Sequence, residues 1–237
     1  MNILSRAAAA TFFCLSSALA VAQAPAAVDE GLVAVRAKKV ERAWLLPGAD
    51  FRPFTKVLLR KAEVSFQRNW LRDVNSNSIH RTADRVTQED ALRIIDAARA
   101  GFDQVWAQAF ASAGYAVVSS PGDDVLEVAP RVVNLYVNAP DVKSSSISRT
   151  YTVQSGEATL QLDVRDSRKG TLLGRVSDKR DAGFGMSVQS SNSVTNRSDF
   201  EQLFATWARI AVDGLQELKA NSPLPEDLKA GQKVPKR

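Results

Sequence analysis

The sequence predicts an α+β fold: a mixed, mostly antiparallel sheet of about five strands with two amphipathic helices packed on one face. Two segments repeat apolar residues at spacings of three and four, which is typical of helices that bury one side. Between them, another segment alternates apolar and polar residues, which is typical of a strand with one buried face. Strands also precede the first helix, and this order favours a single sheet that carries both helices.

The N-terminal part of the domain is expected to contribute strands. Residues 56–66 read KVLLRKAEVSF, an apolar run typical of a strand, and residues 32–37 form a shorter candidate. Trp44 and Trp70 also lie here, where each could cover a sheet edge or stack on a ligand. Burial in the core is the expected role, because an exposed indole ring leaves a large apolar area in water.

The first long helix is expected near residues 87–114. Thr87 to Asp90 resembles a capping box, with aspartate in the place of the usual glutamate or glutamine. Gly114 stands where a glycine commonly ends a helix. The apolar stripe consists of Leu92, Ile95, Phe102, Val105, Trp106, Ala109 and Phe110.

Further strands are expected between the two helices. Residues 131–137 are apolar on both faces, which indicates a central strand, and residues 115–118 form a short one. Residues 158–164 alternate strictly, so one face should be buried and the other wet. Residues 166–170 are typical of a hairpin loop, after which residues 171–178 form the returning strand.

The second long helix is expected to begin at Ser198, because Ser198 and Glu201 complete a capping box. Its apolar positions again define one stripe, so Trp106 and Trp207 should share one core. The stripe consists of Phe200, Leu203, Phe204, Trp207, Ile210, Ala211, Leu215 and Leu218.

The N-terminus has the features of a secretory signal peptide over residues 1–22. Arg6 precedes an uncharged apolar run that is too short for a membrane span, and small residues permit cleavage after Ala22. Cys14, the only cysteine, lies inside this run behind Phe13, so no lipoprotein signal is expected. The mature protein is therefore expected in the periplasm or at the outer membrane, without a thiol or a transmembrane span.

Charge distribution argues against nucleic acid as a partner. The net charge is +5, but basic residues are scattered without a Lys/Arg block, and part of the excess lies in the termini. Residues 23–220 are expected to form one domain. Residues 221–237 lack periodicity and are expected to form a disordered basic tail.

No catalytic signature, metal site or cofactor site is evident. His80 is the only histidine and no nucleophile elbow accompanies it, so neither a zinc site nor a catalytic triad is expected. Residues 73–84 are a near miss for a calcium loop, because Ser78 replaces the glycine at the turn. A carboxylate pair on the polar sheet face, Asp163 with Asp178 or Asp181, remains as a hydrolase-like alternative.

The polar connections 141–148 and 181–198 are the expected places of recognition. The second is longer than compact domains usually contain, which favours a binding loop or a mobile flap. Around them lie charged, amide and aromatic side chains suited to recognition, although the same groups could simply satisfy nearby backbone. The candidate binding residues are Asn138, Arg149, Tyr151, Asn192, Asn196 and Arg197.

Several blocks in order resemble the bacterial family called domain of unknown function 3313. They include residues 44–51 (WLLPGADF), 114–128 (GYAVVSSPGDDVLEV), 134–141 (NLYVNAPD) and 192–208 (NSVTNRSDFEQLFATWA), and the likeness extends over about residues 31–219. The resemblance implies an exported protein of Gram-negative bacteria, many relatives being outer-membrane lipoproteins. It implies no activity and no catalytic residue, because none is established for the family.

Together these observations favour a non-enzymatic envelope protein that binds a partner protein or a cell-wall component. The hydrolase-like enzyme and a small-ligand carrier with a pocket between sheet and helices are the alternatives. A flat polar face would favour the partner binder, whereas a deep pocket with clustered carboxylates would favour the enzyme.

Overall fold

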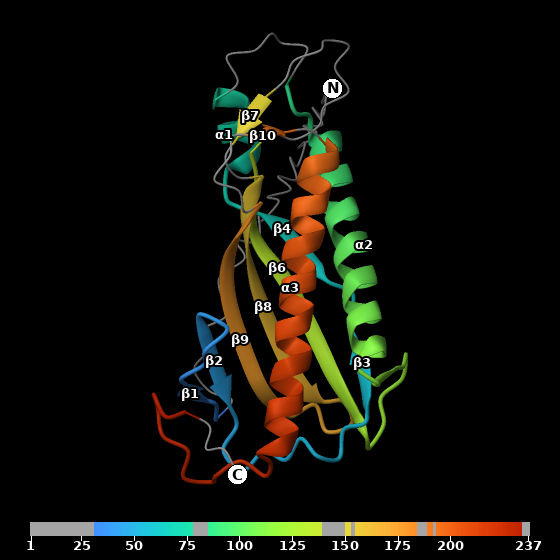
Figure 1. Cartoon of the computed structure of the whole chain (residues 1–237), viewed down its shortest axis with the longest axis vertical. Helices are drawn as coiled ribbons and strands as arrows, with labels where there is room; N and C mark the ends of the chain where they lie inside the picture. The colour runs from blue at the N-terminus through green and yellow to red at the C-terminus, as the bar shows by residue number, and fades with distance from the viewer. Residues whose placement is uncertain are drawn as a thin grey trace, which may run out of the picture.

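The computed structural model describes residues 31–77, 85–138, 150–152, 155–183, 189–191 and 193–233. Within them, eight strands form one sheet in the order β1-β2-β9-β8-β6-β3-β5, and β4 also pairs with β6 (Figure 1). The pairs from β1 to β6 are antiparallel, whereas β3, β4 and β5 run parallel to their partners. The strands are β1 (Val33–Val35), β2 (Arg42–Leu45), β3 (Lys56–Leu59), β4 (Glu63–Phe66), β5 (Ala116–Val117), β6 (Val125–Val137), β8 (Gly156–Asp166) and β9 (Leu172–Ala182).

The α+β class agrees with the sequence, but the predicted number of elements was too low. In the described residues, β7 (Thr150–Thr152) and β10 (Gln189–Ser191) form a separate small sheet, and α1 (Trp70–Asn77) is an additional helix. β2 was also missed. These elements are short, so tertiary partners rather than their own periodicity define them.

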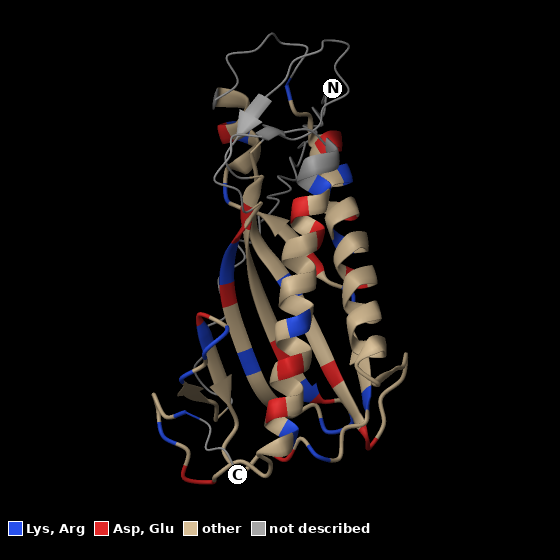
Figure 2. Cartoon of the chain, viewed as in Figure 1, with Lys and Arg blue, Asp and Glu red and all other residues tan. Residues whose placement is uncertain are grey.

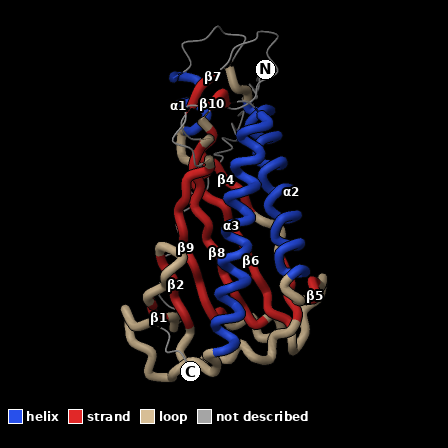
Figure 3. The backbone as a smooth tube through the Cα atoms, in the orientation of Figure 1, coloured by secondary structure: helices blue, strands red, loops and turns tan. Residues whose placement is uncertain are grey.

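The two long helices, α2 (Gln88–Ser112) and α3 (Ser193–Ala220), cover one face of the sheet, as predicted (Figures 1 and 3). Phe102, Trp106 and Trp207 are at most 1% exposed and belong to one core. Aromatic rings from both helices therefore fill the space between helices and sheet. None of the described helices is long and apolar enough to cross a membrane.

The predicted capping box of α2 is confirmed. The Thr87 hydroxyl accepts a hydrogen bond from the Asp90 amide (3.1 Å), and the Asp90 carboxylate accepts one from the Thr87 amide (2.9 Å). Hydrogen bonds from the Thr87 side chain and backbone lower the pKa of Asp90. The carboxylate at this helix start therefore remains ionised over the ordinary pH range.

The predicted start of the second long helix was wrong, because α3 begins at Ser193 rather than Ser198. Ser198 is exposed on the helix, and the neighbouring Asp199 accepts a hydrogen bond from the Ser155 hydroxyl just before β8. Serine and acidic residues are ordinary on exposed helix surfaces, so a capping-box pattern can also occur after the true start. The connection predicted over residues 181–198 is correspondingly shorter.

The strand predicted over residues 56–66 is divided into β3 and β4. The amide of Arg60 still donates to the carbonyl of Val128 in β6 (2.9 Å), but the amide of Ala62 donates to the Asp103 carboxylate of α2 (2.9 Å). The chain therefore leaves the strand ladder at a contact with a helix. The apolar pattern alone does not contain this information.

Residues 166–170 form the predicted hairpin loop between β8 and β9. The Asp166 carboxylate accepts hydrogen bonds from the amides of Arg168 and Lys169, both at 2.9 Å. Gly170 has a φ of 71°, a conformation that glycine adopts without steric cost. Local side-chain and glycine chemistry thus define this turn.

The prediction of a disordered tail from residue 221 does not hold for residues 221–233. Leu224 and Leu228 are buried in the core, 3% and 5% exposed. The Ser222 hydroxyl accepts a hydrogen bond from the Phe51 amide (2.9 Å). The segment packs because it finds apolar partners far away in sequence.

The same segment continues the sheet beyond β1. The amide of Gly231 donates to the carbonyl of Ala34, and the amide of Arg36 donates to the carbonyl of Gln232, both at 2.9 Å. Backbone groups on the outer side of β1 are thereby paired. Covering an edge strand in this way limits unwanted pairing with other chains.

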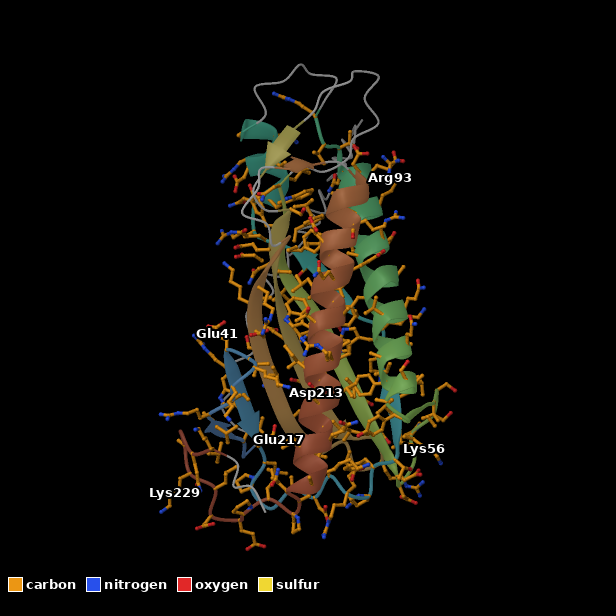
Figure 4. All side chains as sticks on the ribbon, viewed as in Figure 1. Glu41, Lys56, Arg93, Asp213, Glu217 and Lys229 are labelled. Carbon is orange, nitrogen blue, oxygen red and sulfur yellow. The ribbon has the colours of Figure 1, made fainter. Side chains whose placement is uncertain are left out.

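We expect Leu228→Ala to lower the free energy of unfolding by about 2 kcal/mol, because it leaves a cavity under the C-terminal segment. The matched control is Lys229→Ala, which changes the exposed neighbour labelled in Figure 4 and should alter stability by less than about 0.5 kcal/mol. Urea unfolding followed by circular dichroism measures both. Equal midpoints for the two variants would contradict the packing of this segment.

Candidate functional site

The two faces of the main sheet differ in chemistry. Leu160 and Leu162 of β8 belong to the core beneath the helices, whereas Asp163, which follows them in the alternation, lies on the opposite side. We call this side, which faces away from α2 and α3, the open face. Figure 2 shows charged residues of both signs along β9, the neighbour of β8, and of these Arg175, Lys179 and Asp181 pair in register with the open-face residues of β8. The wet face predicted from the alternation of residues 158–164 is present.

Three arginines from neighbouring strands surround Asp163 on the open face. Arg175 of β9 lies opposite Asp163 and donates two hydrogen bonds to its carboxylate, from Nε (2.6 Å) and Nη2 (2.7 Å). Arg165 of β8 and Arg131 of β6 each bring Nη2 near Oδ2 of the same carboxylate, at 3.6 and 3.9 Å. We call these four residues the arginine cluster. Three guanidinium groups against one carboxylate leave it with an excess of positive charge.

The members of the arginine cluster differ in exposure. The side chains of Asp163 and Arg175 are 10% and 12% exposed, whereas those of Arg131 and Arg165 are 29% and 28% exposed. The bidentate pair is therefore the buried base, and the other two guanidinium groups reach solvent. Each guanidinium carries several N–H donors in a planar fork, so one carboxylate cannot accept from all of them, and Nη1 of Arg165 donates instead to the carbonyl of Gly170 (3.2 Å).

The row of long side chains on the open face is interrupted at Ala129. Ala129 of β6 lies opposite Asp163 and remains partly exposed. Arg131 follows Ala129 by two residues in β6, and Arg165 follows Asp163 by two residues in β8, each about 7 Å along its strand. Because β6 and β8 are antiparallel, these two arginines lie on opposite sides of the Ala129–Asp163 pair.

Ion pairs of opposite charge flank the arginine cluster. Arg60 lies 2.7 Å from Glu127, and Lys179 lies 2.8 Å from Glu157. The hydrogen bond to Glu127 raises the pKa of Arg60. Glu127 lies opposite Arg165 in the strand register but is paired with Arg60, so these pairs are nearly neutral and the positive excess lies in the centre of the face.

Trp44 and Glu63 border the arginine cluster on two sides. Trp44 of β2 lies opposite Arg175 in the strand register and is half-buried. It is therefore on the open face rather than in the core, next to Arg175 in the strand register. Glu63 of β4 lies opposite Arg131 and is exposed, which reduces the positive excess at that edge.

The carboxylate pairs considered for a hydrolase do not form. Asp178 lies opposite Leu160 and points to the helix side, where its Oδ2 accepts a hydrogen bond from Nε1 of Trp207 (2.9 Å). Asp181 lies opposite Glu157, which is six residues and about 20 Å from Asp163 along the strand. Asp163 itself is held by Arg175. No acid and base converge at these positions.

The space between sheet and helices, where a carrier would hold its ligand, is occupied by aromatic rings. Phe102 stacks on Trp106 (ring centroids 4.7 Å apart) and meets Phe204 edge-on (5.2 Å). A pocket of about 400 Å³ lies elsewhere, at the end of the sheet that carries the β8–β9 hairpin. Charged and polar side chains line much of it, including Asp50, Asp123, Asp166, Arg168 and Lys169.

The predicted binding residues that the structure describes lie at the end of the molecule where β7, β10 and the start of α3 meet (Figure 1). Asn138 is exposed directly after β6, and its amide donates to the carbonyl of Ser155 (3.0 Å). Tyr151 pairs with Ser190 in the register of β7 and β10. The structure thus brings the backbones of these segments, far apart in sequence, to one end of the fold.

The other predicted binding residues are only partly described. Asn196 and Arg197 lie in the first turns of α3 rather than in a loop, and Arg197 is exposed. Arg149 and Asn192 lie outside the described residues. Recognition by this end of the molecule stays a prediction.

The region of the near-miss calcium loop is helical where it is described. Asp73 and Asn75 belong to α1, and the Asn75 side chain both accepts from the amide of Val86 and donates to its carbonyl. Asn75 therefore fastens α1 to the start of α2. His80 lies outside the described residues. Among the described residues, no group of three or more His, Cys, Asp or Glu side chains could hold a metal ion.

None of the arginines of the cluster was among the predicted binding residues. The alternation of residues 158–164 did indicate the wet face on which Asp163 lies, and this was the available signal. Arg131, however, belongs to a strand that is apolar on both sides in sequence. Strand order and register were needed to bring it to Asp163.

Comparisons with known proteins give a family and a distant fold likeness. The family described as "Protein of unknown function (DUF3313)" matches residues 23–211. No curated protein matches.

Three solved structures are similar over most of the chain. A variant of the PelC dodecamer from Paraburkholderia phytofirmans has 9% identity and a TM-score of 0.37, covering 73% of this chain and 97% of that one. A DUF330 protein from Xanthomonas campestris has 13% identity and a TM-score of 0.37, covering 70% and 83%. A neuraminyllactose-binding hemagglutinin homolog from Helicobacter pylori has 14% identity and a TM-score of 0.34, covering 73% and 86%. At these TM-scores the likenesses carry no argument about function.

Proposed function

The chain belongs to the DUF3313 family, for which no function is known, and we propose that it is a non-enzymatic protein of the bacterial envelope that binds a partner protein through its open face. The observation that carries the proposal is that, within the described ranges, the long helices cover only one face of the sheet (Figure 1). Both long helices pack on one face, and the opposite face presents polar and charged side chains that are partly exposed. Export rests on the predicted signal peptide.

The chemistry of the open face supports binding rather than catalysis. Its central carboxylate, Asp163, is held in a bidentate pair with Arg175 and is not placed to act as a general base. Arginine and tryptophan, both present here, are the residue types that most often dominate protein interfaces. A polar sheet face of this kind suits a macromolecular surface better than a small molecule.

A position-specific photo-crosslinking experiment tests the proposal in intact cells. A photo-reactive amino acid replaces Gln161, which lies on the open face between Arg131 and Ser177 in the strand register. The matched control replaces Arg209, an exposed residue of α3 on the helix side. We expect one defined protein to be captured from position 161 and not from position 209, because only the first position lies on the proposed surface.

A third position separates the two surfaces under consideration. The same photo-reactive amino acid at Arg197 reports on the end of the molecule that the sequence favoured. Capture from position 197 without capture from position 161 would show that the partner binds at the end of the molecule near the start of α3 and not on the open face. Capture from none of the positions would contradict the proposed function.

A further inference from the structure

Resting on the proposed function, we propose that the arginine cluster binds a carboxylate side chain of an acidic segment of the partner protein, held between Arg131 and Arg165. This assigns the ligand chemistry at the centre of the open face. The excess of positive charge attracts an anion there, and the flanking ion pairs Arg60–Glu127 and Lys179–Glu157 leave the surroundings nearly neutral.

The arginine cluster already contains one guanidinium–carboxylate pair of the proposed kind. Arg175 holds Asp163 by two parallel N–H···O hydrogen bonds, the geometry in which a guanidinium fork matches a carboxylate. This internal pair stabilises the base of the cluster. Arg131 and Arg165 approach the same carboxylate to 3.9 and 3.6 Å through Nη2, and both side chains remain partly exposed. Nη1 of Arg165 also donates to the carbonyl of Gly170 (3.2 Å), so it is the Nη2 side of this guanidinium that faces the position of a second carboxylate.

Access for that second carboxylate is provided by Ala129. Its methyl group occupies the position opposite Asp163, where a longer side chain would extend beside the carboxylate. Arg131 and Arg165 lie on either side of this position. Trp44, beside Arg175, offers an apolar ring to the aliphatic part of an incoming acidic side chain or to its neighbour.

The distribution of charge favours a protein partner over a lipid surface. Glu63, Glu127 and Glu157 lie on the same face and would repel a continuous anionic membrane surface, whereas a protein segment can present a single carboxylate to the cluster and neutral or basic groups to these glutamates. Arg131 and Arg165 are also less than one-third exposed and do not project as membrane-binding side chains do. A second copy is disfavoured because a two-fold interface centred here would place the positive cluster against itself.

The test measures binding of a fluorescent peptide of alternating glutamate and serine by fluorescence anisotropy, with the glutamine counterpart as control ligand. Two variants remove the site in opposite ways. Arg131→Gln with Arg165→Gln removes both forks, and Ala129→Glu supplies an internal carboxylate to the same forks. Arg209→Gln removes one positive charge at an exposed position of α3, on the helix side of the sheet, and is the control variant.

We expect the glutamate peptide to bind and the glutamine peptide not to bind. Affinity should fall about tenfold or more in the double variant and in Ala129→Glu, and stay unchanged in Arg209→Gln. Ala129→Glu should keep or raise the melting temperature, which separates blocked binding from unfolding. Undiminished binding by either site variant would overturn the proposal.

Two further arms separate this inference from the proposed function. The first arm measures binding to vesicles of phosphatidylethanolamine and phosphatidylglycerol. If the parent protein binds these vesicles and the double variant does not, the ligand is a lipid headgroup and the proposal of a protein ligand is overturned. Crosslinking from position 161 that persists in the double variant would leave the open face as the binding surface but overturn carboxylate recognition by the arginine cluster.

Discussion

Replacing Asp178 by alanine is expected to lower the free energy of unfolding by about 3 kcal/mol, because this buried carboxylate joins three parts of the fold. Its Oδ1 accepts a hydrogen bond from the amide of Glu41 (2.9 Å), and its Oδ2 accepts from Nε of Arg180 (2.6 Å) and Nε1 of Trp207 (2.9 Å). The side chain is only 5% exposed, so water cannot replace these bonds. Figure 4 shows Glu41 beside β2, at the margin of the sheet.

The expected cost is at the lower end of the range for broken buried ion pairs, because the Arg180 side chain is 34% exposed and water can solvate it again. Asp178→Asn keeps one oxygen acceptor and should cost less than the alanine variant. The matched control is Asp181→Ala on the exposed side of β9, which should change stability by less than about 0.5 kcal/mol. Urea unfolding measures all three, and equal effects at 178 and 181 would contradict the inward orientation of Asp178.

Trp106→Ala and Trp207→Ala are each expected to lower the free energy of unfolding by about 3–5 kcal/mol, the usual cost of deleting a large buried ring. Both residues are 1% exposed and belong to the core between sheet and helices. A variant as stable as the parent protein in a urea melt would show that its ring does not contribute to this core.

Phenylalanine in place of each tryptophan separates ring packing from hydrogen bonding. Nε1 of Trp207 donates to Asp178 (2.9 Å), whereas Nε1 of Trp106 is buried without a partner among the described residues. Trp207→Phe should therefore cost about 1–2 kcal/mol more than Trp106→Phe, because it leaves a buried acceptor with one bond fewer. Similar costs for both phenylalanine variants would argue against the importance of the Trp207–Asp178 bond.

Local sequence patterns predicted the elements in which buried positions recur at a regular spacing. Strict alternation in residues 158–164 predicted both the strand and the face on which Asp163 lies, and the spacing of apolar residues predicted α2 and α3. Several short elements were missed, namely β2, α1, β7 and β10. Four residues such as Arg42–Leu45 contain too few repeats to show a period, and β2 is a strand because it pairs with β9.

Recognition chemistry was predicted in polar connections because such segments often carry function. Charged residues within strands were not predicted to bind, because such residues ordinarily form ion pairs on a solvent-exposed surface. Arg131, Arg165 and Arg175 belong to three separate strands, and nothing local distinguishes them from such residues. The arginine cluster was consequently outside the reach of pattern analysis.

What the sequence by itself determined is the set of regular elements with long amphipathic patterns, the helix cap at Thr87, the hairpin at Asp166 and the family. These depend on interactions between residues a few positions apart, and such interactions leave a period or a motif in the sequence. Only the tertiary structure decided the strand order β6-β8-β9, the packing of Leu228 and the meeting of three arginines at Asp163. These features depend on strand register and on contacts between segments that are distant in sequence. Their stabilising energy comes from the pairing and packing of two segments, so neither segment alone carries a pattern that reveals it.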